Sequence, residues 1–138
     1  QARRQAPGLP IGASEWAATE QLIELGGEMV EGLLIVQNYN RDDRSARFSG
    51  FSEAYFKRFK RPPGYSSVSA YDAAIVVLTA LKNQQRNETL KAAAQRSGPY
   101  IGLQQSISFD ANGDTQRTVY FTEIRSRKYV QVDSGEKR

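Results

Sequence analysis

The stretch LPIGASEWAATEQLIELGGEMVEGLLIV, residues 9–36, indicates the class of the fold. It starts with a short apolar piece, Leu9–Gly12, and ends with the continuous apolar run Leu33–Val36, which has the length of a strand. Between them, apolar residues recur at the spacing of one helical face: Leu22, Ile23, Gly26, Met29 and Val30. An uninterrupted apolar run suits a strand covered on both faces, as in a parallel sheet. The stretch therefore predicts a βαβ unit and an α/β fold.

Three helices are expected after this unit. The first has an aromatic stripe at spacings of three and four and ends at Pro62-Pro63-Gly64; we expect its inward residues to be Phe48, Phe51, Tyr55, Phe56 and Phe59. The second is Ala-rich, runs to about Asn83 and has the stripe Val68, Tyr71, Ile75, Leu78 and Leu81. The third starts near Asn87, as its N-cap, and ends before Gly98-Pro99.

The last third of the chain changes to the period of a strand. Apolar residues alternate from Leu103 to Phe109, and the turn residues Asp110–Asp114 follow. Two further runs, Val119–Thr122 and Tyr129–Val132, are rich in β-formers. We therefore expect closing β-strands after the helices.

Composition excludes several kinds of chemistry. The 138 residues carry a net charge of +4 and include no Cys and no His. Disulfides, thiolate metal sites, Cys nucleophiles and the histidine general base are thus absent from this chain. The longest apolar runs, Gly32–Val36 and Ala73–Leu78, fall far short of the roughly 18 residues that span a bilayer. One domain is the default count for this length.

Three motifs have a structural explanation that competes with a functional one. Asp110–Asp114 places Asp and Asn as in a calcium loop, but Gly113 is fourth and Phe121 stands where a Glu ligand is needed, which favours a turn. The stretch Phe56–Arg61 interleaves aromatics with cations, as a nucleic-acid surface does, yet its spacing favours a solvated helix face. Asn87-Glu88-Thr89 fits a glycosylation acceptor, but Asn87 is already expected to cap a helix.

Glu15 is the candidate functional acid. It follows a short strand and precedes a helix, at the carboxyl end of a strand, where α/β sheets place ligand contacts. A carboxylate there can hold an ammonium group through a charge-assisted hydrogen bond, or it can simply complement the helix N-terminus. Its neighbours share this ambiguity: Ser14 can cap the helix through its hydroxyl, and Trp16 can stack on a ligand or fix the helix to the sheet.

The order of motifs resembles the carboxyl-terminal part of a type I periplasmic solute-binding protein of ABC transporters, in the branched-chain amino acid (Leu/Ile/Val) receptor family. The helix Ala70-Tyr71-Asp72-Ala73-Ala74 and the turn Ile107–Asp114 are the most diagnostic pieces. Three further stretches match in order: Gly26–Leu33, Phe51–Phe59 and Tyr100–Leu103. Ser106 departs from the family, which often has Gly there.

The resemblance implies a two-lobed α/β protein that closes on a small solute and then docks on a membrane permease. Residues 1–38 and 115–138 are expected in the second lobe and residues 39–114 in the first. The amino-terminal half of the family, with most groups that hold the α-carboxylate, is expected to precede this chain. The resemblance also implies a periplasmic or extracytoplasmic location.

The resemblance further implies a ligand set without catalytic residues, metal or cofactor. Glu15 stands where amino acid receptors place the acid that binds the ligand ammonium, and Ser14 and Trp16 lie beside it. Tyr65 and Ser66 lie near where a first-lobe aromatic touches the ligand side chain. Tyr71 and Asp72 are expected to pack and to cap their helix instead.

Two alternatives to a transport receptor remain open at this stage. A sensor domain of the same fold would signal on closure, and a nucleic-acid-binding module would rest on the cations Lys57–Arg61. A hydrolase is disfavoured because no second acid, base or nucleophile is placed beside Glu15 or Asp110. The chain by itself is expected to expose apolar helix faces and a sheet edge, which self-association between copies can cover.

Overall fold

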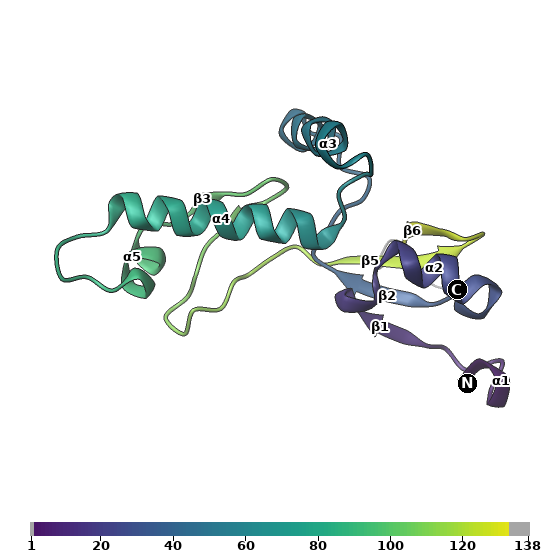
Figure 1. Ribbon diagram of the computed structural model, residues 1–138. Helices are drawn as coiled ribbons and strands as arrows, with labels where there is room; N and C mark the ends of the chain where they lie inside the picture. The colour runs from purple at the N-terminus through teal and green to yellow at the C-terminus, as the bar shows by residue number, and fades with distance from the viewer. Residues whose placement is uncertain (1, 133–138) are drawn as a thin grey trace. The chain divides into compact units, whose positions relative to one another are not determined.

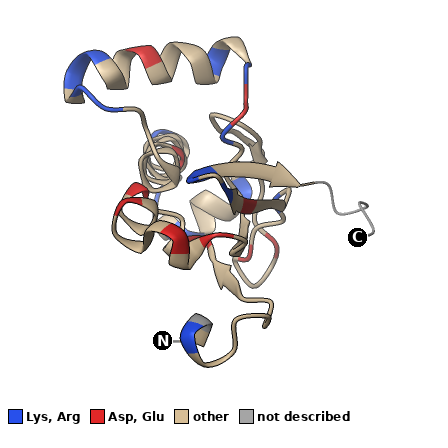
Figure 2. Cartoon of the chain, turned by 90° about the vertical axis from the view of Figure 1, so that its right-hand side faces the viewer, with Lys and Arg blue, Asp and Glu red and all other residues tan. Residues whose placement is uncertain are grey.

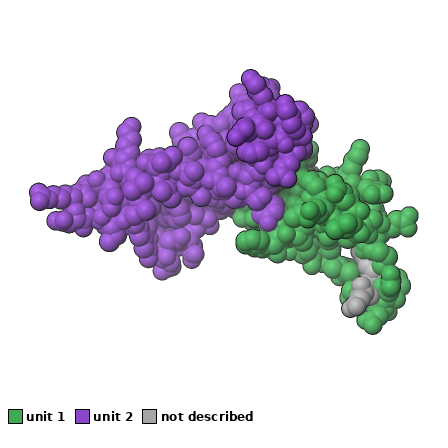
Figure 3. Space-filling view, in the orientation of Figure 1, with its two compact units in different colours: residues 1–42, 119–138 green, residues 43–118 purple. Residues whose placement is uncertain are grey.

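The computed structural model describes residues 2–132 of the chain. These residues form two compact units, one of residues up to 42 together with those from 119 onward, and the other of residues 43–118 (Figure 3). Residue 1 and residues 133–138, which the sequence assigns to the second lobe, lie outside the described residues. The chain passes between the units twice, after Asp42 and after Thr118.

The first unit is built around a four-stranded sheet in the order β1-β2-β5-β6 (Figure 1). Its strands are β1 (Gly12–Ser14), β2 (Leu34–Gln37), β5 (Tyr120–Arg125) and β6 (Lys128–Val132). Strands β1 and β2 are parallel, with Gly12 opposite Leu34, whereas β5 runs antiparallel to both β2 and β6. The predicted βαβ unit is therefore present, although its first strand starts three residues later than the apolar piece at Leu9.

The single helix expected between β1 and β2 is instead three short pieces. A short helix α1 (Ala2–Gln5) precedes β1, and the connection consists of η1 (Glu15–Ala17), α2 (Glu20–Gly26) and η2 (Gly27–Val30). Thr19, not Ser14, caps the α-helical part, because the Thr19 hydroxyl accepts a hydrogen bond from the Leu22 N–H at 3.2 Å and Ser14 makes no such bond. Gly27 ends α2 with φ at 51°, a backbone conformation that residues other than glycine rarely adopt.

Strand β2 is not covered on both faces among the described residues, contrary to the expectation from its apolar run. Ile35 and Gln37 are buried, while Leu34 and Val36 are 39% and 40% exposed. The alternation arises because the described chain supplies one helical layer, which lies along one face of the sheet (Figure 1). An apolar sequence shows that both faces can be buried, but the neighbouring layers decide whether they are.

The second unit contains the three predicted helices and a short hairpin. The helices are α3 (Ala46–Phe59), α4 (Tyr65–Asn83) and α5 (Leu90–Arg96), and the hairpin pairs β3 (Tyr100–Ile101) with β4 (Ser106–Ile107) (Figure 1). Its core includes Val76, Tyr100 and Ile107, with Ala94 and Phe109 packed against them. The third helix is capped by Thr89, whose hydroxyl accepts from the Ala92 N–H, and not by Asn87.

Two of the predicted inward stripes are displaced. The buried residues of α4 are Val68, Asp72, Val76 and Ala80, at steps of four, whereas Tyr71, Leu78 and Leu81 of the expected stripe are exposed. On α3, Phe48 is buried but Phe56 and Phe59 are exposed. Apolar residues surround much of α4, so periodicity could not choose its buried face. On α3 the aromatic residues lie on one face, but the described residues leave Phe56 and Phe59 exposed.

The Asp72 carboxylate is an anchor within the second unit and not a helix cap. It lies within α4, 2% exposed, and its Oδ1 accepts the Leu103 N–H at 2.8 Å. Its Oδ2 lies 3.8 Å from Arg117 Nη1. Gly102 allows this approach, because a Cβ at Gly102 would lie 2.6 Å from the Gln105 carbonyl oxygen and 3.0 Å from Asp72 Oδ1. The motifs AYDAA and YIGL therefore contact each other.

Candidate ligand-binding site

The structure places Glu15 directly after β1, at the carboxyl ends of the two parallel strands. Ser14 is the last residue of β1 and lies opposite Val36 near the end of β2. The Glu15 side chain crosses to the segment after β2, where its Oε1 accepts the Asn38 N–H at 2.9 Å. Both carboxyl ends thus meet at one edge of the sheet, which is where open α/β sheets bind ligands.

Only one of the two Glu15 oxygens is occupied. Among residues 2–132, the Asn38 N–H is the single hydrogen-bond donor to this carboxylate, and Oε2 accepts none. The side chain is half-buried. An ionised carboxylate oriented by one main-chain donor and open on its other oxygen can accept a charge-assisted hydrogen bond from an ammonium or guanidinium group.

The two neighbours of Glu15 present their side chains to solvent. Trp16 is 82% exposed, so within the described chain it does not fix the helix to the sheet. The Ser14 hydroxyl makes no capping hydrogen bond. An exposed indole and a hydroxyl beside a half-satisfied carboxylate could stack on and bond to a polar solute.

A second feature of this region was missed by sequence reasoning. The Arg41 guanidinium lies 4.0 Å from the Tyr129 ring centroid and 5.4 Å from that of Tyr39, and it bonds Glu20 at 2.8 Å. Burial raises the pKa of the Tyr129 hydroxyl to about 12, so it stays protonated and donates to the Thr19 carbonyl oxygen at 2.6 Å. No motif signals this cluster, because its residues lie up to 110 positions apart.

Tyr65 and Ser66 belong to the second unit, whereas Ser14, Glu15 and Trp16 belong to the first. Tyr65 is the first residue of α4, whose N-cap, Gly64, offers no side-chain cap. Tyr65 is half-buried and Ser66 exposed, and neither side chain makes a hydrogen bond among the described residues. The predicted ligand set is therefore divided into one group in each unit, and its role stays a prediction.

The Asp110–Asp114 segment has the geometry of a turn. Asp110 Oδ1 accepts the N–H groups of Asn112, Gly113 and Asp114, each at 2.9 Å, and these bonds lower the pKa of the Asp110 carboxyl. Gly113, at φ 95°, supplies the left-handed residue of the turn. In the described part of the chain, no group of three acidic side chains is placed to hold a metal ion.

The basic residues of α3 are distributed along the helix. Figure 2 shows Lys and Arg at both ends of α3 with an acidic residue between them. Lys57 and Arg58 occupy its last turn and Lys60 follows as the C-cap, in the left-handed conformation. Cations at a helix C-terminus complement the macrodipole, so this stretch needs no nucleic acid to explain it.

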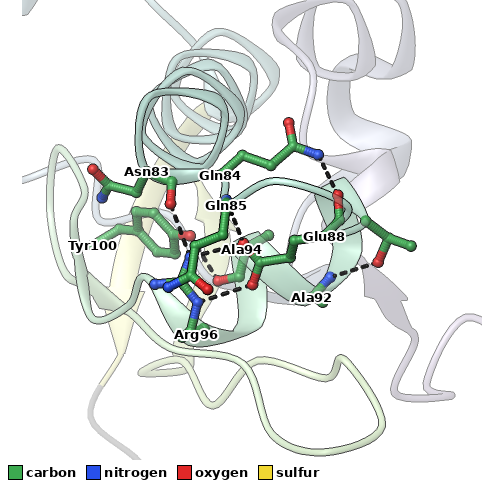
Figure 4. A network of polar contacts seen from close by, with 9 residues as sticks. Asn83, Gln84, Gln85, Glu88, Ala92, Ala94, Arg96 and Tyr100 are labelled. Atoms are coloured by element: carbon green, nitrogen blue, oxygen red, sulfur yellow. Dashed lines mark hydrogen bonds and ion pairs between the residues drawn. The ribbon is translucent and has the colours of Figure 1, made fainter.

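An ion pair between Glu88 and Arg96 stabilises the connection between α4 and α5 (Figure 4). Arg96 donates to both Glu88 oxygens at 2.9 and 2.8 Å, and the Gln85 N–H donates to Glu88 Oε2 at 2.9 Å. The hydrogen bonds from Arg96 and Gln85 lower the pKa of the Glu88 carboxyl to about 2. Arg96 also donates to the Asn83 carbonyl oxygen at 2.8 Å. Both Glu88 oxygens are thus hydrogen-bonded within this connection, which indicates a structural role.

Residues 5–129 match the model of the family described as periplasmic binding protein, and the chain belongs to this family. No protein among the curated sequences matches the chain. None of the helices in the described residues has the length and apolar character needed to cross a membrane.

Solved structures of solute-binding proteins share the fold. A leucine-binding protein of Thermotoga maritima is 26% identical with a TM-score of 0.83, and the match covers 96% of this chain and 39% of that one. A substrate-binding protein of Desulfitobacterium hafniense in complex with Leu is 23% identical, with a TM-score of 0.76 and coverage of 95% and 38%. A branched-chain amino acid substrate-binding protein of Streptococcus pneumoniae in complex with isoleucine is 22% identical, with a TM-score of 0.78 and coverage of 96% and 40%.

The chain thus spans about two fifths of the length of these proteins. The expected type I periplasmic binding protein fold is confirmed, as a part of that fold. These three relatives are solute-binding proteins, and two of them hold Leu or isoleucine.

Proposed function

We propose that this chain is the carboxyl-terminal part of an extracytoplasmic receptor that captures an amino acid between two lobes and delivers it to an ABC permease of the inner membrane. The bound Leu and isoleucine of the similar structures favour a branched-chain amino acid as the solute. In this proposal the chain has no catalytic role. Glu15 has one hydrogen-bonded neighbour among the described residues, the Asn38 N–H, which is neither an acid nor a base for catalysis.

The observation that carries the proposal is the half-occupied Glu15 carboxylate. Its Oε1 is held by the Asn38 N–H at 2.9 Å, and its Oε2 is left for a donor that the described residues do not supply. The α-ammonium group of an amino acid is such a donor, with three N–H bonds and a full positive charge. Trp16 and Ser14 would line the same side of the solute, and Tyr65 and Ser66 would approach it from the other lobe.

The lobe assignment is part of the proposal. Residues 1–38 and 115–138 would belong to the second lobe and residues 39–114 to the first. The two compact units support this assignment. Their boundaries lie at residues 42 and 118, each four positions later than expected. The two crossings of the chain would then be hinge segments, which absorb the change in backbone angles when the lobes close.

The test is calorimetric titration of the intact receptor with L-leucine and then with the other amino acids. Glu15→Gln keeps the size of the side chain and removes its charge. It should weaken binding by about 1.5–3 kcal/mol, the value of a hydrogen bond to a charged group, or roughly ten- to 150-fold in Kd. Glu24→Gln is the control, because Glu24 is exposed on α2 and its side chain makes no hydrogen bond or ion pair among the described residues.

An unchanged affinity in Glu15→Gln would refute the assigned role of Glu15. If no amino acid binds the wild-type receptor, the proposed solute class is wrong.

A further inference from the structure

The segment that carries the candidate ligand groups, Glu15–Glu20, has little core of its own. Its 3₁₀ turn, η1, contains no buried residue. Ala18 is the first buried residue of the segment, and Trp16 is exposed. A short connection of this kind would fluctuate unless other parts of the fold held it in place.

Arg41 restrains the Glu15–Glu20 segment through two hydrogen bonds. Its Nη2 donates to the Ala18 carbonyl oxygen at 2.9 Å, and its Nη1 donates to Glu20 Oε1 at 2.8 Å. Both acceptors lie at the carboxyl end of the Glu15–Glu20 segment, one on each side of Thr19. The Asn38 N–H, three residues before Arg41, holds Glu15 at the other end of the segment.

Two aromatic rings fix the guanidinium itself. Tyr129 of β6 lies 4.0 Å from it and Tyr39 lies 5.4 Å from it, measured to the ring centroids. The Tyr129 hydroxyl also donates to the Thr19 carbonyl oxygen at 2.6 Å, so Tyr129 contacts both the arginine and the segment that the arginine holds. The Arg41 side chain is 17% exposed, which strengthens its interactions relative to those of a surface arginine.

We infer that Arg41 is a positioning residue for Glu15: it keeps the Glu15–Glu20 segment in the conformation that directs the free Glu15 oxygen at a ligand. The inference rests on the function proposed above. Lysine cannot replace arginine here, because an ammonium group lacks the planar fork that reaches Ala18 and Glu20 while stacking between rings. The residue acts through the segment and does not itself touch the solute.

The test is a double-mutant cycle on L-leucine affinity in the intact receptor. Arg41→Gln and Arg41→Lys should each raise the Kd on the order of tenfold when Glu15 is present. In the Glu15→Gln background the same substitutions should raise the Kd by a clearly smaller factor, since the carboxylate that Arg41 positions is gone and only Trp16 remains on the segment. A substitution that merely loosened the fold would weaken binding equally in both backgrounds, and that result would overturn the inference.

Trp16, the single tryptophan of the chain, gives a second readout that needs no ligand. Arg41→Gln should lower the fluorescence anisotropy of Trp16 and raise its quenching by acrylamide, because the segment gains motion on the nanosecond timescale. Trp16→Phe measures the signal of any other tryptophan in the intact receptor, which is subtracted. Arg86→Gln removes the same charge at an exposed loop position and should leave both readouts unchanged.

The two proposals can fail separately. If L-leucine and the other amino acids do not bind the wild-type receptor, the proposed function fails, while the Trp16 signal still decides whether Arg41 holds the segment. An unchanged Trp16 signal in both Arg41 variants would overturn the inference even if L-leucine binds. If Arg41→Gln does not fold, Arg41→Lys, which keeps the charge, decides the outcome.

Discussion

Glu15 in the first unit and Asp72 in the second make the same contact in different surroundings. Each carboxylate accepts one main-chain N–H from a distant residue, Asn38 at 2.9 Å and Leu103 at 2.8 Å. Asp72 is buried, and its second oxygen faces Arg117. Glu15 is half-buried, and its second oxygen is open.

This difference separates a structural carboxylate from one that is available to a ligand. A buried charge is tolerated when it is hydrogen-bonded and paired with an opposite charge, and Asp72 has the Leu103 N–H on one oxygen and Arg117 near the other. A carboxylate with one hydrogen-bonded oxygen costs little free energy when water hydrates the other oxygen. That second oxygen can then form a charge-assisted hydrogen bond with a cationic ligand. Four predictions test the comparison, beginning with the largest expected effect.

Removing the Asp72 carboxylate should cost the most. Asp72→Ala would leave the buried Leu103 N–H without its acceptor and Arg117 without its partner, which should lower the free energy of unfolding by about 3 kcal/mol. Urea unfolding monitored by circular dichroism measures this value. Glu53→Ala, at an exposed position on α3, is the control and should stay within about 0.5 kcal/mol of wild type. A loss below about 1 kcal/mol for Asp72→Ala would show that the carboxylate is not an anchor.

The close approach of the backbone at Gly102 should give the next effect. In Gly102→Ala the new Cβ would meet the Gln105 carbonyl oxygen at 2.6 Å, and the hairpin would have to move away from Asp72. Overpacking of this kind costs about 1–3 kcal/mol. Gly50→Ala is a matched control, because a Cβ at Gly50 of α3 meets no atom within 4 Å. Equal unfolding free energies for the two variants would contradict the tight contact.

Within the first unit, the two hydroxyls on either side of η1 should behave differently. Thr19→Ala removes the N-cap of α2 and should destabilise the protein by about 1 kcal/mol. Ser14→Ala removes a hydroxyl that caps nothing and should leave the unfolding free energy unchanged, although it can weaken solute binding. Thermal unfolding of both variants, compared with calorimetric affinity, separates a role in stability from a role in binding.

The smallest effect on stability is expected from substitution of Glu88, because its partner Arg96 is exposed to solvent. Its pKa is lowered from 4.5 to about 2 in the folded state, so its stabilising contribution is complete above pH 4.5 and disappears as the pH falls toward 2. Glu88→Gln should therefore reduce Tm at pH 6 and have no effect near pH 2. A difference in Tm that persists unchanged at pH 2 would mean that the ion pair is not its source.

The sequence was sufficient for the helices of the second unit because each has strong local signals. The break at Pro62-Pro63-Gly64 separates α3 from α4, Gly98-Pro99 follows the end of α5, and Asp110–Asp114 forms the turn, all as predicted. The buried faces of α3 and α4 could not be read in the same way. The apolar residues of α4 cover more than one face, and on α3 the end of the aromatic stripe, Phe56 and Phe59, stays exposed. Only contacts with other elements decide which of these residues are buried.

The candidate site was predictable in part. The position of Glu15 at the end of a strand followed from the βαβ pattern, and the structure shows it there. The Asn38 N–H that orients it, and the stacking of Arg41 on Tyr129, could not be predicted, because these contacts join residues 23 and 88 positions apart. No local pattern encodes which main-chain donor a side chain reaches across a fold.

The sequence by itself determined the α/β class, the order of most elements and the motifs AYDAA and ISFDANGD, because turn residues, caps and periodicity act over a few positions. Only the tertiary structure decided that Asp72 faces the core and that Arg41 holds the segment after Glu15. The physical reason is that burial and hydrogen-bond partners are properties of packing between distant segments. Local propensity limits that packing but does not specify it.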